Sequence, residues 1–284
     1  MKYPFIFLLL MSILSLFSAC ASVPYPYGQN LEKGPILALR TQEQQFEHGK
    51  PHAFVDGLGH YVLSLPSKLI LWNWSVDNHK ISTNTEDVIA EYLAQNDLSN
   101  VKVRINQYSP GDEWRRLVKN RGMPGFFRYT FGVLTNVSYT ILPGRVFGGD
   151  HYNPFTNTIN IYSDHPAITL HEAAHAKDFA SKSRSFRGWY AIMRLLPGLP
   201  LYQEAKATGD AIGYMKEEKI PKMEKDAYKI LYPAYMTYIS GEALNWISID
   251  TWITYAVQFT VAIPGHVVGR IKAENVEHSG SSTQ

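Results

Sequence analysis

Hydrophobic and polar residues follow two different periods along the chain, and each period predicts one kind of element. Between residues 83 and 94 the apolar positions Val88, Ile89, Tyr92 and Leu93 have the spacing of an amphipathic helix. Between residues 101 and 108 apolar and polar residues alternate strictly, which is typical of a half-buried strand. The same reasoning predicts helices over 110–119, 166–182 and 201–214, a short edge strand over 157–162, and one or two strands within the aromatic and β-branched segment 126–142.

Strands and helices in this order predict an α+β fold, with a small sheet and a mainly helical C-terminal half. The chain is 45% hydrophobic and shows no internal repeat, so we expect one domain over residues 51–272 and a flexible tail over 273–284. Residues 143–154 are rich in turn-forming residues and are expected to border a cleft. Within them, His151 and Tyr152 are weaker candidates for stabilising an oxyanion.

The N-terminus has the pattern of a secretory signal peptide over residues 1–19. Lys2 precedes an apolar run from Phe5 to Phe17, which is too short for a comfortable membrane span and ends in small residues. The segment Phe17-Ser18-Ala19-Cys20 resembles a bacterial lipobox. That resemblance implies a lipid on Cys20, and Ala21 after it resembles outer-membrane sorting. We therefore expect residues 20–50 to be a tether that holds the protein at the outer membrane, facing the periplasm.

Charge and cysteine content exclude two classes of protein. The net charge is +2 and falls to about +1 when the signal peptide removes Lys2, which is too weak a basic balance for nucleic-acid binding. Cys20 is the only cysteine, so a disulfide framework is impossible. Stability must come from the hydrophobic core.

The region 230–270 is unusually apolar and contains only Glu242 and Asp250 as acidic residues. Its longest uncharged run, 251–269, has about the length of a membrane span but includes Gln258, Pro264 and His266. We expect a pair of buried or interfacial helices here, with membrane contact as a further possibility, rather than a spanning segment.

The segment His171-Glu172-Ala173-Ala174-His175 carries the strongest chemical signal, an HExxH motif within the helix predicted over 166–182. Residues four apart share a helix face, so both histidines can reach one Zn²⁺ ion. Glu172 lies one step round the helix, where its carboxylate can act as general base on a water. A strand followed directly by an HExxH helix resembles the layout of zincin metallopeptidases. The alternative is a buried helix whose two histidines are hydrogen-bonded core residues.

A catalytic zinc of this type needs a third protein ligand, and Glu204 is the candidate. It lies on the predicted helix 201–214, after the break at Pro197-Gly198-Leu199-Pro200. With this glutamate the chain resembles the gluzincin branch of zincins. The resemblance implies His171, His175 and Glu204 as ligands and Glu172 as general base. Many gluzincins have an aspartate four residues after the ligand glutamate, whereas this chain has Thr208.

Three other residues compete with Glu204 for the third position. Asp178 follows His175 on the same stripe, but it is one turn too far along the axis, so hydrogen bonding to a ligand histidine or pairing with Lys182 suits it better. Asp210 lies on another face of its helix and is a second candidate for supporting a ligand. His165 precedes the HExxH helix and is expected to cap it.

Two functional hypotheses follow. The first is a membrane-anchored zinc metallopeptidase that hydrolyses peptide or protein substrates in the cell envelope. The second is a non-catalytic envelope interaction lipoprotein with a structural or vestigial metal site, whose working part is the apolar region 230–270. Glu172 discriminates between them, because a structural site has no use for a general base.

Overall fold

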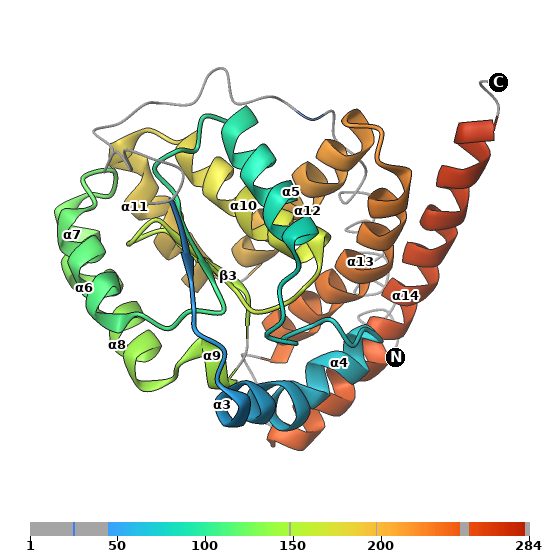
Figure 1. Ribbon diagram of the computed structural model, residues 1–284, viewed down its shortest axis with the longest axis horizontal. Helices are drawn as coiled ribbons and strands as arrows, with labels where there is room; N and C mark the ends of the chain where they lie inside the picture. Colours follow the sequence, from blue (N-terminus) through green and yellow to red (C-terminus); the bar gives the residue numbers. More distant parts are fainter. Residues whose placement is uncertain (1–24, 26–44, 148, 197, 245–249, 282–284) are drawn as a thin grey trace, which may run out of the picture. The chain divides into compact units, whose positions relative to one another are not determined.

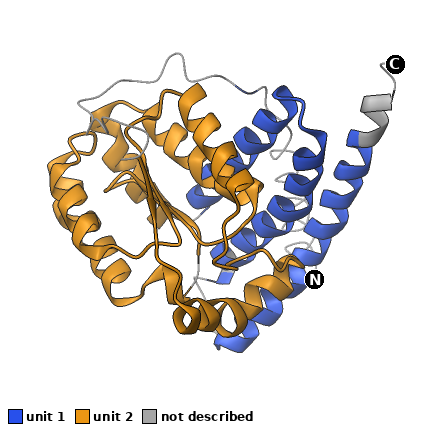
Figure 2. Ribbon diagram, viewed as in Figure 1, with its two compact units in different colours: residues 1–26, 197–284 blue, residues 27–196 orange. Residues whose placement is uncertain are grey.

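The computed structural model describes residue 25 and residues 45–147, 149–196, 198–244 and 250–281 (Figure 1). The chain divides into two compact units, one of residues 27–196 and one of residues 1–26 together with 197–284 (Figure 2). A single domain over residues 51–272 stays a prediction. The signal peptide, Cys20 and the tether up to residue 44, apart from Tyr25, lie outside the described residues.

A four-stranded mixed sheet organises the unit of residues 27–196. Its strands are β1 (Phe46–His48), β2 (Lys102–Ile105), β3 (His151–Asn153) and β4 (Thr158–Ile161), in the spatial order β1-β2-β4-β3. The first three in that order are parallel, and β3 runs antiparallel to β4. The prediction that 157–162 is an edge strand is therefore wrong, because β4 is paired on both sides. Phe46–His48, near the end of the predicted tether, form β1 of this sheet.

The two faces of the sheet differ in chemistry. Val103, Ile105, Ile159 and Ile161 are buried on one face, because residues of one strand alternate between faces and paired residues share a face. Helix α10 (Pro166–Ala180) lies on this side, where the ring of Phe179 meets Tyr152 of β3 at 5.7 Å between centroids. The apolar face thus supports the helix that carries the HExxH motif.

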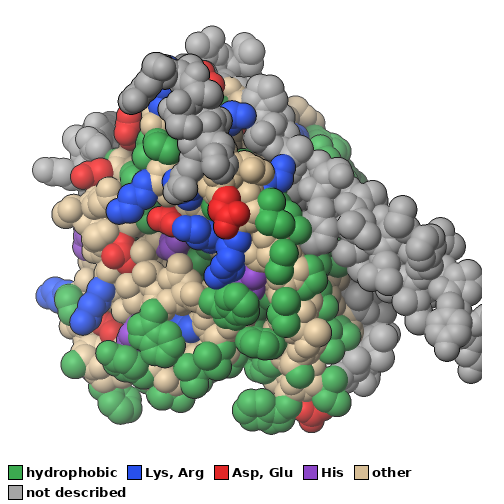
Figure 3. Space-filling view, turned by 90° about the vertical axis from the view of Figure 1, so that its right-hand side faces the viewer, with side chains coloured by type: hydrophobic (Ala, Val, Ile, Leu, Met, Phe, Trp, Pro, Cys, Tyr) green, Lys and Arg blue, Asp and Glu red, His purple; other side chains and the backbone are tan. Residues whose placement is uncertain are grey.

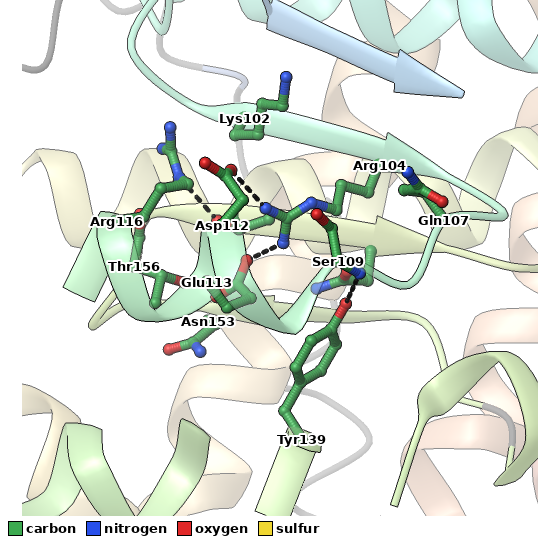
Figure 4. A network of polar contacts seen from close by, with 12 residues as sticks. Lys102, Arg104, Gln107, Ser109, Asp112, Glu113, Arg116, Tyr139, Asn153 and Thr156 are labelled. Atoms are coloured by element: carbon green, nitrogen blue, oxygen red, sulfur yellow. Dashed lines mark hydrogen bonds and ion pairs between the residues drawn. The ribbon is translucent and has the colours of Figure 1, made fainter. Parts of the chain in front are cut away.

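The other face is polar yet buried, and Arg104 of β2 is its centre (Figure 4). Helix α6 (Pro110–Lys119) supplies Asp112, 2.6 Å from the guanidinium, and the buried Glu113, which also pairs with it. Glu47 of β1 lies 3.1 Å from Nε of Arg104. Position 104 was expected on the exposed face of a half-buried strand. It is buried because three carboxylates compensate the charge.

The remaining helices of this unit surround the sheet. Helices α5 and α6 agree with the sequence prediction, and α5 packs against α10. The predicted strands within 126–142 are wrong, because that segment is helical. The helical elements not yet given are α3 (Ala53–Leu58), π-helix η2 (Gly59–Leu63), α4 (Leu65–Leu71), α5 (Thr83–Gln95), α7 (Gly125–Phe127), π-helix η3 (Arg128–Gly132), α8 (Val133–Ile141), α9 (Gly144–Phe147), α11 (Arg184–Ile192) and 3₁₀-helix η4 (Met193–Leu195).

The described C-terminal residues of the other unit are helical throughout most of their length. Helices α12 (Leu199–Glu217), α13 (Pro221–Leu244) and α14 (Thr251–Ser281) follow one another, with α13 packed against both of its neighbours. The expected helix pair in region 230–270 is confirmed, whereas the expected flexible tail is helical as far as Ser281. Among the described residues, no helix has both the length and the apolar character needed to cross a membrane.

Candidate metal centre

Helix α10 forms for reasons that can be read in its sequence. Pro166 occupies the first turn, where no backbone donor is needed, and the ring of His165 caps the helix by accepting from the backbone N of Ala167 at 3.3 Å. Alanines fill the turn between the two histidines and favour helix. Nearly every residue from Ala167 to Phe179 is buried, so the helix lies within the protein rather than on its surface.

His171 and His175 point their rings at one place on this helix. Their Nε2 atoms are 3.1 Å apart, and the rings meet edge to face with centroids 4.7 Å apart. Two nitrogens bound to one zinc ion at about 2.05 Å and a tetrahedral angle would be about 3.3 Å apart, so the spacing fits a shared metal. Both side chains are buried, as is Glu172 between them.

Glu204 lies in the second turn of α12. The helix begins after Gly198, whose φ of 75° is one that glycine adopts without strain, and Pro200 occupies its first turn. Glu204 is only 1% exposed, which excludes the alternative that it is an ordinary surface glutamate. Ligand atoms of His171, His175 and Glu204 all lie within 4.8 Å of one another. The three residues predicted as ligands therefore form one buried group.

The competing residues have other contacts. His165 is the helix cap, as predicted. Asp178 accepts from Lys182 at 2.9 Å and also from the hydroxyl of Tyr190, so the predicted alternative of an i,i+4 ion pair is present. Asp210 is partly buried on α12, six residues after Glu204. A supporting role for Asp178 or Asp210 stays a prediction.

His151 and Tyr152, the weaker oxyanion candidates, both have structural partners on β3. The ring of His151 lies 2.9 Å from the carbonyl of Gly149 and 3.2 Å from the amide of Asn160, and burial lowers the pKa of this histidine. The hydroxyl of Tyr152 donates to Asn157 at 2.8 Å, and burial raises its pKa. An oxyanion-stabilising role for either residue stays a prediction.

The sequence did not reveal which of the described strands ends the sheet next to α10. Strand β3, not β4, ends the sheet on the side that contacts α10. It has only three residues inside a turn-rich segment, which is too short for a period to be recognised. The outer edge of β3 is the place where an extended chain can pair with this sheet.

The donor set of the buried group can be judged on its chemistry. Two imidazoles and one carboxylate are the ligands that catalytic zinc sites use, with the fourth position left for water. The residues present thus fit a zinc ion. Comparison of the chain with protein-family models, curated proteins and solved structures found no match.

Proposed function

We propose that this protein is a zinc-dependent metallopeptidase held at the outer membrane by a lipid on Cys20, where it acts on envelope peptides or proteins. The observation that carries the proposal is the buried group of His171, His175 and Glu204, in which the HExxH helix α10 supplies both histidines. In this account these three side chains hold the ion. Zinc in such a site polarises both a water and the scissile carbonyl.

Glu172 is the residue that moves the proton. It is buried and follows His171 directly, about 100° round the helix from that ligand. In the proposed reaction it accepts a proton from the attacking water and delivers it to the leaving nitrogen. A site whose only task is structural has no need of this residue.

The outer edge of β3, with which no described strand pairs, supports the choice of an extended peptide as substrate. An added strand hydrogen-bonds through its main chain, so binding of this kind accepts many side-chain sequences. Helix α10, which carries the HExxH motif, contacts both β3 and β4. The motif helix therefore packs against the strand that offers this edge. We therefore assign peptide binding by strand addition to β3 rather than to β4, which is paired on both sides.

The decisive experiment replaces Glu172 by Gln in the mature chain beginning at Ala21. We expect zinc content to stay unchanged and hydrolysis of an unfolded protein such as casein to fall at least about 100-fold. Glu217→Gln is the matched control, because Glu217 is exposed on α12 and should leave hydrolysis unchanged. Full hydrolysis by a metal-loaded Glu172→Gln protein would disprove the mechanism. Absence of hydrolysis in wild type with zinc bound would favour the non-catalytic interaction protein instead.

A further inference from the structure

Helix α14 exposes an apolar stripe over most of its length. Trp252, Phe259, Ile263, Val267 and Ile271 are between 41% and 79% exposed and recur at intervals of four or seven residues, which places them on one side of the helix. From Trp252 to Ile271 the stripe is about 28 Å long, at 1.5 Å per residue. Hydrophobic side chains gather on the face of the molecule shown in Figure 3. A helix at a protein surface ordinarily shows polar residues there.

The opposite side of α14 is occupied by α13, so the exposed stripe is a second apolar face. A Cβ on Gly265 would come within 2.7 Å of Cα of Pro233, and one on Gly269 within 2.3 Å of the backbone oxygen of Tyr228. Two glycines four residues apart thus bring the backbones of α13 and α14 close together. Because this contact uses one face of α14, the outward stripe is available to something else.

Charged residues are absent from the apolar part of α14 and begin where the stripe ends. Residues 251–269 carry no formal charge, so burying this part costs no desolvation of an ion. Arg270 follows at once, seven residues after Ile263 and so on the side of the stripe, and Glu274 lies one turn further on that side. Both are exposed, and lipid phosphates attract the Arg270 guanidinium. Trp252 and Tyr255, at the other end, combine an apolar ring with a polar group, as residues at a membrane interface do.

A second copy of the chain fits this stripe less well than a bilayer. A strip about 28 Å long and about 10 Å wide buries on the order of 300 Å² on each copy. Two copies would bury about 600 Å², well below the roughly 1,200 Å² of a stable interface. Insertion into the headgroup region needs no such minimum area, since affinity grows with the apolar surface inserted.

We infer that the exposed face of α14 lies on a lipid bilayer, parallel to its surface, with Trp252, Phe259 and Ile263 inserted and Arg270, on the same side of the helix, at the headgroups. This second contact would hold the protein against the membrane in addition to a lipid on Cys20. A lipid anchor and a surface contact together bind a membrane much more firmly than either alone. The inference does not depend on the zinc site, because membrane binding can be measured without activity.

The test is sedimentation with vesicles of phosphatidylethanolamine and phosphatidylglycerol, using the mature chain from Ala21 so that no lipid anchor contributes. We expect wild type to bind and Phe259→Ser/Ile263→Ser to partition at least about tenfold less, because two half-exposed apolar side chains are removed. Leu134→Ser/Ile141→Ser is the matched control, since both residues are more exposed and lie on α8. It should bind within about twofold of wild type.

Three outcomes would overturn the inference. Wild type could fail to bind these vesicles, or the control pair could lose as much binding as the α14 pair. Alternatively, sedimentation without vesicles could reveal a dimer that Phe259→Ser/Ile263→Ser abolishes, which would make the stripe a contact between copies. Circular dichroism of both variants establishes that they fold.

The role of Arg270 has its own test. Wild type should prefer vesicles containing phosphatidylglycerol to neutral phosphatidylcholine vesicles, and Arg270→Gln should reduce that preference by about fivefold. Circular dichroism establishes that Arg270→Gln, which loses the contact with His266, still folds. Equal binding of wild type and Arg270→Gln to anionic vesicles would contradict the placement of Arg270 at the headgroups.

Discussion

The Nε2 atoms of His171 and His175 lie 3.1 Å apart inside the protein, on consecutive turns of α10. Such a distance suits either a hydrogen bond between two neutral rings or two lone pairs directed at one metal. Glu204 favours the metal, because its ligand atoms lie within 4.8 Å of those of both histidines and complete the two imidazoles and one carboxylate that catalytic zinc sites use. The two interpretations differ in what zinc does to stability.

Zinc should stabilise the wild-type protein and leave His175→Ala unaffected. A ligand that binds only the folded state adds about 2.7 kcal/mol at a concentration of 100 times its Kd. The melting temperature followed by circular dichroism should therefore rise when zinc is added to chelator-treated wild type. An equal rise in His175→Ala would show that zinc acts at another place.

Breaking the buried ion pair of Arg104 and Glu113 should destabilise the fold far more than breaking a surface pair. Both side chains are almost fully buried, and Glu113→Gln leaves the guanidinium with less compensating charge, at a cost of about 3 kcal/mol. The exposed pair of Arg115 with Asp112 is the control, and Arg115→Gln should cost less than about 1 kcal/mol. Urea unfolding measures both. Similar losses would mean that the network centred on Arg104 does not hold α6 to the sheet.

Asp150 should make stability depend on pH between about 4 and 6. Burial, together with repulsion by Asp77, raises the pKa of this carboxyl from 3.8 to about 6. The folded state then keeps a proton that the unfolded chain has lost, so this contribution to stability falls as pH rises through that window and is constant above it. Since the side chain is partly accessible to solvent, the change should be on the order of 1 kcal/mol.

The control for this prediction is Asp150→Asn. Its amide oxygen can still accept from the backbone N of Tyr162 and of Ser163, which lie 2.6 and 3.0 Å from the Asp150 carboxylate. Unfolding at several pH values should show a slope in wild type that the variant lacks. A variant with the same slope would assign the effect to another group.

Two glycine substitutions should shift stability in opposite directions. An added Cβ at Gly269 meets the backbone of Tyr228 at 2.3 Å, so Gly269→Ala should separate α13 from α14 and cost about 2 kcal/mol. Nothing lies within 4 Å of a Cβ at Gly241, in helix α13, so Gly241→Ala should gain about 0.5–1 kcal/mol. Thermal unfolding distinguishes the two. A stabilising Gly269→Ala would contradict the close packing of α13 and α14.

The sequence predicted elements well where one strong period dominates. Helix α5 has apolar residues on one face, and α10 combines a cap, a first-turn proline and a run of alanines. Glu204 could be placed on a helix because the break before it is marked by Pro197, Gly198 and Pro200. These local signals were enough to select the three residues of the buried group.

Where prediction failed, contacts made by distant residues decided the structure. In 126–142 the buried residues Phe127, Gly132, Asn136 and Tyr139 have helical spacing, but exposed apolar residues between them hide it and suggest strands. The order of strands in the sheet is not encoded locally, so β4 was predicted as an edge strand. Its polar residue Thr158 is nevertheless buried, and it accepts a hydrogen bond from Arg116 at 3.1 Å. Strands β1 and β3 have three residues each, too few to show a period.

Metal content is the most direct test of the central claim. Mass spectrometry of the mature chain from Ala21 should find about one zinc per wild-type molecule, and none in His171→Ala or Glu204→Ala. Glu217→Gln, changed on the exposed side of α12, should retain zinc. A folded wild-type protein without zinc would contradict the account. Zinc lost in His171→Ala but kept in Glu204→Ala would contradict Glu204 as the third ligand and direct attention to Asp178 and Asp210.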